Sequence, residues 1–220
     1  MFVKMWMSTE LVTAGPDLPI LDARNRMKER GVRRLPVIHN GQLVGVVTEG
    51  DIQEASPSDA NSLSVWELNY LLAKTTVEQI MTPRRDLSVV APGDPIEKAA
   101  LLMRERKVSG LPVLDDDALV GIVTESDLFG AFLNVLGATQ PGARLTLAMK
   151  NTPGALLPVL KTFKALLLNV LSLPTCDACL RALPGAGRDI VVVMHIEGYD
   201  PQPLVAPLRK LGVRVLDARS

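Results

Sequence analysis

The chain has 220 residues, 24 basic and 24 acidic side chains, and 47% hydrophobic residues, so its formal net charge is zero. This composition excludes a disordered chain, and the zero charge argues against a general nucleic-acid binder, which needs a basic surface. The N-terminus lacks the apolar run of a secretion signal, and the longest apolar stretch, near 165–173, is too short to span a bilayer. Two cysteines cannot form a disulfide framework and indicate a reducing compartment. We therefore expect a cytoplasmic protein that binds neither nucleic acid nor membrane.

The N-terminal half contains an internal repeat with an offset of 76 residues. Positions 5–52 share 20 identities with the 48 residues that lie 76 further on. Unrelated segments of this length would share about three, given average residue usage. The identities include Pro19-Ile20 with Pro95-Ile96, Leu35-Pro36-Val37 with Leu111-Pro112-Val113, Leu43-Val44-Gly45 with Leu119-Val120-Gly121, and Thr48-Glu49-x-Asp51 with Thr124-Glu125-x-Asp127.

Each copy has the pattern of a β-α-β-β-α unit. A proline begins the first helix, where its missing N–H costs nothing, and Asn40-Gly41 is typical of a tight hairpin turn. A second helix follows each Thr-x-x-Asp. Two such units can cover each other as a pseudo-twofold pair with clefts between them. The expected elements are strands 11–14 and 87–91, helices 19–30 and 95–106, hairpin strands 35–38 and 43–47, and hairpin strands 111–114 and 119–123.

A linker separates the two copies. Ser56-Pro57-Ser58 is typical of a loop, and Ser64-Val65-Trp66-Glu67 is a capping-box pattern that predicts a helix through Leu72. The predicted domains are therefore a first copy at 1–55, a linker with a helix at 56–76 and a second copy at 77–135.

The C-terminal third, 144–220, predicts a separate domain. Its pattern indicates the order β-α-β-β-α-β, which is ferredoxin-like. The fold class predicted for the whole chain is therefore mixed α/β, of the α+β type. The expected elements are strand 144–150, helix 155–166, strand 169–173, strand 189–196, helix 201–211 and strand 213–218, with a loop-rich segment at 176–187.

The repeated Thr-x-x-Asp motif has two interpretations. Thr48 with Asp51, and Thr124 with Asp127, form capping boxes that satisfy a helix end. The same residues lie where a strand ends and a helix begins, which is a common place for ligands and phosphates. At such a place an aspartate can accept hydrogen bonds from the two hydroxyls of a ribose. Duplication copies caps as well as sites, so the spacing alone leaves both interpretations open.

The repeated motifs resemble the CBS domain, and two in tandem resemble the CBS pair, or Bateman module, over residues 5–132. This resemblance implies that an adenosine nucleotide or S-adenosyl compound binds between the copies, with Asp51 and Asp127 on ribose and Thr48 and Thr124 on ribose or phosphate. It also implies an adenine wall formed by the first strands and the Leu-Pro-Val strands, including Val12, Thr13, Pro36, Ser88, Val89 and Pro112.

The residues before Leu-Pro-Val differ between the copies. The first copy has Arg33-Arg34 and the second has Ser109-Gly110. Some adenylate-binding members of the family meet phosphate here, and a guanidinium suits phosphate through its forked donors. Arg33 and Arg34 are either phosphate ligands or a solvated corner. In either case the two clefts are not equivalent.

The C-terminal domain resembles an ACT domain through Asn151, Pro153, Gly154 and Leu156. That family often binds amino acids at this turn, which makes Asn151 and Gly154 candidate ligand residues. Leu167-Leu168-Asn169 stands where the family usually has a glycine, so a dimerisation or packing domain without a ligand is the other interpretation. The whole order, CBS–CBS–ACT-like, resembles the acetoin utilization protein AcuB group.

The remaining candidates are few. We expect Cys176-x-x-Cys179 to form neither a zinc site nor a disulfide, because His39 and His195 are poorly placed to complete a site and no redox context is present. We interpret His195 as a strand histidine whose hydrogen bonds are satisfied.

The leading hypothesis is a regulatory sensor that needs no cofactor, binds AMP, ADP, ATP or an S-adenosyl compound, forms a homodimer and acts on a protein target. The alternatives are a constitutive scaffold with degenerate clefts and an enzyme. We expect no enzyme, since the chain has no HExxH, Walker loop, nucleophile elbow or GxGxxG.

Overall fold

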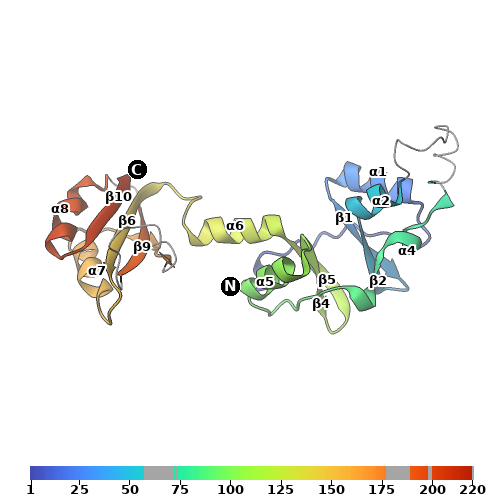
Figure 1. Ribbon diagram of the computed structural model, residues 1–220, viewed down its shortest axis with the longest axis horizontal. Coiled ribbons are helices and arrows are strands. Elements are labelled where there is room, and N and C mark those ends of the chain that lie inside the picture. The colour runs from blue at the N-terminus through green and yellow to red at the C-terminus, as the bar shows by residue number, and fades with distance from the viewer. Residues whose placement is uncertain (57–71, 73, 177–188, 198–199, 220) are drawn as a thin grey trace. The chain divides into compact units, whose positions relative to one another are not determined.

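The computed structural model describes residues 1–56, 72, 74–176, 189–197 and 200–219. It divides into two compact units, Met1–Leu128 and Phe129–Ser220 (Figure 1). Both helices and strands contribute to each unit, so the chain has a mixed α+β fold. No helix among the described residues is long and apolar enough to cross a membrane.

The hairpins and helices of the two copies form where the sequence predicts them. Asn40 and Gly41 both have positive φ values, 50° and 80°, as the predicted tight turn requires, and Asp116 and Asp117 do the same at 43° and 68°. Pro19 and Pro95 lie one position before their helices, as N-caps. The elements are α1 (Ile20–Arg30), β1 (Arg34–His39), β2 (Gln42–Thr48) and α2 (Glu49–Ala55), followed by α5 (Ile96–Arg106), β4 (Gly110–Asp115), β5 (Ala118–Thr124) and α6 (Glu125–Val135).

The predicted first strand of each copy is wrong. Segments 11–14 and 87–91 are extended, but each makes only one isolated parallel bridge, Ala14 with Val37 and Val90 with Val113. Two hydrogen bonds hold each bridge; Ala14 N donates to Pro36 O at 2.9 Å and Ile38 N to Ala14 O at 2.9 Å. A proline follows each segment within two residues and has no N–H with which to extend the ladder.

The N-terminal segment of each copy completes the other copy. β3 (Thr82–Pro83), which is preceded by α4 (Val77–Ile80), pairs antiparallel with β2. In return Ser8, which follows η1 (Val3–Met5), bridges Ile122 of β5. Val77 N donates to Leu18 O at 2.9 Å, and Ile96 N donates to Met1 O at 3.0 Å. This exchange joins the two copies into one unit.

Two glycines permit the exchange. A Cβ on Gly45 would lie 2.8 Å from the Thr82 carbonyl oxygen, and a Cβ on Gly121 would lie 2.6 Å from Met7 Sδ. A side chain at Gly45 would meet the backbone of the exchanged segment, whereas one at Gly121 would require the flexible Met7 side chain to move.

The core of the first copy shows the same exchange. Its buried cluster lies between α1, the β1–β2 hairpin and α2, and it includes Val77 from α4, the first helix of the second copy. Figure 1 shows α1 and α2 beside the β1–β2 hairpin. The members are Ala14, Ile20, Ala23, Met27, Leu35, Val37, Val47, Ile52, Leu72 and Val77. Of the predicted linker helix, only Leu72 and Lys74 are described; the rest lies outside the described residues.

The C-terminal unit has its predicted elements in the predicted order. Its antiparallel sheet has the strand order β10-β6-β9-β7, and β8 also pairs with β9. Val159 and Phe163 of α7, with Leu204 and Leu208 of α8, pack in one cluster with the sheet. The elements are β6 (Gly142–Lys150), α7 (Leu156–Ala165), β7 (Val170–Ser172), β8 (Thr175–Cys176), β9 (Asp189–Glu197), α8 (Gln202–Lys210) and β10 (Arg214–Arg219).

Two turn positions of this unit bear on the sequence predictions. Leu167 has a positive φ of 57°, the conformation that the absent glycine would adopt more readily. Its side chain is 94% exposed, so no burial contact offsets that strain. Gly154 has a φ of 81° with open space around it, and it lies with Asn151 in the turn between β6 and α7.

The expectation for Cys176 is corrected. Cys176 is disulfide-bonded, and the only other cysteine of the chain, Cys179, lies outside the described residues. Two cysteines separated by two residues are kept close by the backbone itself, so such a bond needs no long-range framework. His195 is buried in β9, but its Nε2 has no hydrogen-bond partner among the described residues, so the expectation of a satisfied histidine is wrong.

Candidate functional site

A cavity of about 950 Å³ lies within the N-terminal unit, and both copies line it. Its lining consists largely of equivalent positions that lie 76 residues apart, so it follows from the duplication. These pairs include Glu10 and Asp86, Leu11 and Leu87, Val12 and Ser88, Arg33 and Ser109, Arg34 and Gly110, Thr48 and Thr124, and Glu49 and Glu125.

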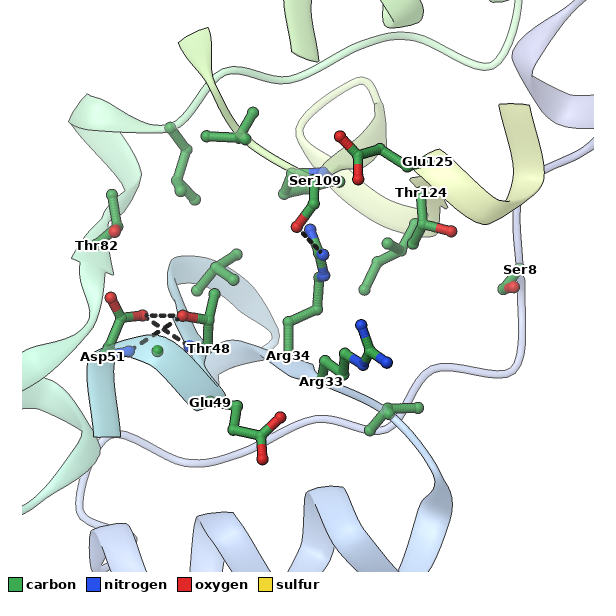
Figure 2. Close-up of a pocket in the computed structure, with 18 of the residues that line it drawn as sticks. Ser8, Arg33, Arg34, Thr48, Glu49, Asp51, Thr82, Ser109, Thr124 and Glu125 are labelled. Carbon is green, nitrogen blue, oxygen red and sulfur yellow. Dashed lines mark hydrogen bonds between the residues drawn. The ribbon is translucent and has the colours of Figure 1, made fainter. Parts of the chain in front are cut away.

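Thr48 and Asp51 lie together at one side of the cavity (Figure 2). Asp51 Oδ2 accepts hydrogen bonds from Thr48 N at 2.7 Å and from Thr48 Oγ1 at 2.8 Å, while Asp51 N donates to Thr48 Oγ1 at 3.2 Å. This is the predicted capping box of α2. The box occupies Oδ2, and in the described part of the chain Oδ1 accepts no hydrogen bond. Capping and ligand binding are therefore compatible at this aspartate.

Thr124 and Asp127 form the same box before α6. Asp127 Oδ2 accepts from Thr124 N and from Thr124 Oγ1, both at 2.7 Å. The two boxes differ in their relation to the cavity. Asp51 is among the residues that line it, whereas in the second copy the lining includes Thr124, Glu125 and Ser126 but not Asp127.

Only some residues of the predicted adenine wall line the cavity. Val12, Ser88 and Pro112 of that wall line the cavity, as do Ser109 and Gly110, the second-copy counterparts of Arg33 and Arg34. Three other predicted residues, Thr13, Pro36 and Val89, are not in its lining. The carbonyl of Thr13 accepts from Arg26 Nη1 at 2.7 Å, and the carbonyl of Pro36 accepts from Ala14 N at 2.9 Å. In the C-terminal unit, Asn151 and Gly154 do not line the smaller cavity on β6 and β10 either.

The cavity contains charged and polar residues that the sequence motifs did not predict. Glu49 and Glu125 are identical at equivalent positions inside the repeated motif, which was a usable signal. The others carry no motif and are brought together only by the fold: Ser8, Glu10, Thr82, Asp86, Arg106 and Lys107.

Both predicted arginines line the cavity, and they point in different directions (Figure 2). Arg33 is exposed, whereas Arg34 is half-buried and reaches the second copy, where its Nη2 donates to Ser109 Oγ at 2.6 Å. Burial lowers the pKa of the Arg34 guanidinium, Glu125 and Asp127 act in the opposite direction, and the charge of Arg33 adds to the lowering. Arg34 is thus a partly desolvated cation at the centre of the cavity.

The comparisons with known proteins agree with this architecture. The family model for the CBS domain matches residues 3–58 and 77–134, which is more than half of the chain. The chain belongs to the CBS-domain family. The matched segments carry both Thr-x-x-Asp motifs and both arginines. A curated relative, protein MJ1225 of Methanocaldococcus jannaschii, is 30% identical over 135 residues; these are 58% of this chain but only 45% of MJ1225.

Two solved CBS pairs are similar to this chain and hold adenosine compounds. The structure of CBSX2 in complex with AMP has a TM-score of 0.51 and 35% identity, and the similarity covers 61% of this chain and 97% of CBSX2; CBSX2 is from Arabidopsis thaliana. The CBS pair of protein MJ0100, in complex with 5′-methylthioadenosine and S-adenosyl-L-methionine, has a TM-score of 0.50 and 30% identity, covering 60% of this chain and 95% of that pair.

Proposed function

We propose that this protein is a regulatory sensor that binds an adenosine nucleotide in the cavity between its two CBS copies. The observation that carries the proposal is the position of Thr48 and Asp51 at that cavity, with one carboxylate oxygen of Asp51 free for a ligand. The complexes of CBSX2 with AMP and of MJ0100 with S-adenosyl-L-methionine support the choice of an adenosine compound.

The chemistry of the cavity suits each part of such a ligand. The free Oδ1 of Asp51 can accept hydrogen bonds from the ribose hydroxyls, and Val12 and Pro112 offer apolar surface to the base. Arg33 and Arg34 supply guanidinium donors for phosphate. Binding regulates if the ligand favours one arrangement of the chain over another. In this proposal the chain has no catalytic role and acts on a protein target.

We propose that the C-terminal unit is an ACT-like domain, as in the AcuB group. Apart from the two-residue strand β8, its elements follow the order βαββαβ, and this order and the β10-β6-β9-β7 sheet path favour a ferredoxin-like fold. It would dimerise the protein or bind a second small ligand at Asn151 and Gly154. Exposed apolar side chains such as Phe132 of α6 and Leu157 of α7 favour a homodimer. The proposed location is the cytoplasm; it rests on the adenosine ligand and not on the cysteines, because Cys176 is disulfide-bonded.

Thermal unfolding with and without ligands tests this function. A ligand at 100 times its dissociation constant should stabilise the folded chain by about 2.7 kcal/mol. We expect a rise in melting temperature with at least one of AMP, ADP, ATP and S-adenosylmethionine, and none with inorganic phosphate at equal ionic strength. If no adenosine compound raises the melting temperature, the cavity is degenerate and the protein is a constitutive scaffold. Release of AMP or phosphate from ATP during the assay would instead indicate an enzyme.

A further inference from the structure

The two halves of the cavity differ at one pair of equivalent positions. Arg34 pairs with Thr48 across the β1–β2 hairpin, and Gly110 pairs with Thr124 across the β4–β5 hairpin. Each therefore lies beside the threonine of its own copy's motif. The first copy has an arginine, the longest basic side chain, at this position, and the second copy has a glycine, which has no side chain.

Arg34 enters the half of the cavity that belongs to the second copy. Its guanidinium donates to Ser109 Oγ at 2.6 Å and lies close enough to Glu125 and Asp127 for their charges to act on it. A Cβ on Gly110 would clash with Arg34 Nη1 and lie 2.7 Å from Arg34 Cζ. Arg34 thus occupies the space that a side chain at 110 would need.

Among the described residues, no side chain occupies the half at Thr48 and Asp51 in the corresponding way. If the second copy had a long side chain at 110, the duplication would direct it toward Glu49 and Asp51, as Arg34 is directed toward Glu125 and Asp127. Gly110 leaves that space open. The cavity lining includes Asp51 and not Asp127, although Thr124 and Glu125 of the second half still line it.

Arg34 is also an incompletely paired cation. No carboxylate of the described residues lies within ion-pair distance of it, and its one side-chain hydrogen bond is to a neutral hydroxyl. A guanidinium has five N–H donors, and a partly desolvated one gains strongly from an anion. Its position at the border between the halves allows it to meet the phosphate of a ligand seated on Asp51.

We propose that Arg34 limits the cavity to one phosphate-bearing adenosine ligand, seated in the half at Thr48 and Asp51, and closes the half at Thr124 and Asp127. This inference rests on the proposed function. It adds that one adenosine ligand binds per chain and that the Arg34 side chain sets this stoichiometry.

Titration calorimetry of the full chain with AMP and with adenosine tests the proposal. The wild type should bind one AMP per chain. Arg34→Ala should bind AMP at least tenfold more weakly, because a charge-assisted contact is lost, and should bind adenosine at two sites, because the second half is open. Arg104→Ala is the matched control; Arg104 is an exposed arginine of α5 outside the cavity lining, and its removal should change neither quantity.

The possible failures are distinguishable. Two AMP per wild-type chain would overturn the role of Arg34 while leaving the proposed function intact, and this measurement needs no variant. A folded Arg34→Ala chain that still binds a single adenosine, or that binds AMP as tightly as the wild type, would also overturn it. If the wild type binds neither AMP nor adenosine, the proposed function fails and this inference fails with it.

Discussion

Asp51→Asn is expected to weaken AMP binding roughly 100-fold, or by about 3 kcal/mol, since the ribose hydroxyls lose a charged acceptor. The asparagine still has one carbonyl oxygen, which can take over the two hydrogen bonds that Asp51 Oδ2 accepts from Thr48. The capping box of α2 is thus retained, and the substitution separates the ligand role from the structural role. Calorimetry gives the affinity, and thermal unfolding without ligand checks the cap.

Asp127→Asn is the matched control for this prediction. Asp127 forms the same capping box with Thr124 but does not line the cavity, so its replacement should change AMP affinity by less than threefold. Equal losses at Asp51 and Asp127 would mean that both halves hold ribose. No loss at Asp51 would mean that the motif serves only as a helix cap.

Phe163→Ala is expected to destabilise the C-terminal unit by about 3–5 kcal/mol, the usual cost of truncating a buried phenylalanine. Phe163 is 1% exposed and lies in the cluster formed by α7, α8 and the sheet. The cavity is lined entirely by residues of the N-terminal unit, so AMP affinity should stay within twofold of the wild type. Urea unfolding followed by circular dichroism should show an early transition that AMP does not shift.

Leu166→Ala provides the control for this truncation. Leu166 directly follows α7 and is 47% exposed, so its loss should change stability by less than about 0.5 kcal/mol. If Phe163→Ala abolished AMP binding while circular dichroism showed an intact N-terminal unit, the C-terminal unit would be part of the binding site.

Much of the fold could be predicted from local signals in the sequence. Asn40-Gly41 fixed the position of one hairpin turn because only such residues accept two positive φ values readily, and Pro19 and Pro95 marked the starts of α1 and α5. The predicted strand at 11–14 failed because Pro16, which follows it, has no N–H with which to extend the ladder beyond the single bridge from Ala14 to β1. The exchange of β3 onto β2 was likewise invisible, since it depends on contacts between the copies.

The sequence predicted many of the residues of the candidate site, but less of their arrangement in space. The repeated motif identified Thr48, Asp51 and Thr124, and the mismatch between Arg34 and Gly110 indicated that the two clefts differ. The sequence could not indicate that Arg34 crosses to Ser109, because the direction of a long side chain is set by the space around it. Asp86 and Lys107 reach the cavity only through tertiary packing, so no local pattern could have identified them.

A crystal structure of the full chain grown with AMP tests the central claim most directly. The account predicts one AMP per chain, with the ribose hydroxyls on Asp51 Oδ1 and the phosphate within hydrogen-bond distance of Arg34. AMP bound on Asp127, or a cavity filled by the protein's own side chains at saturating AMP, would contradict it.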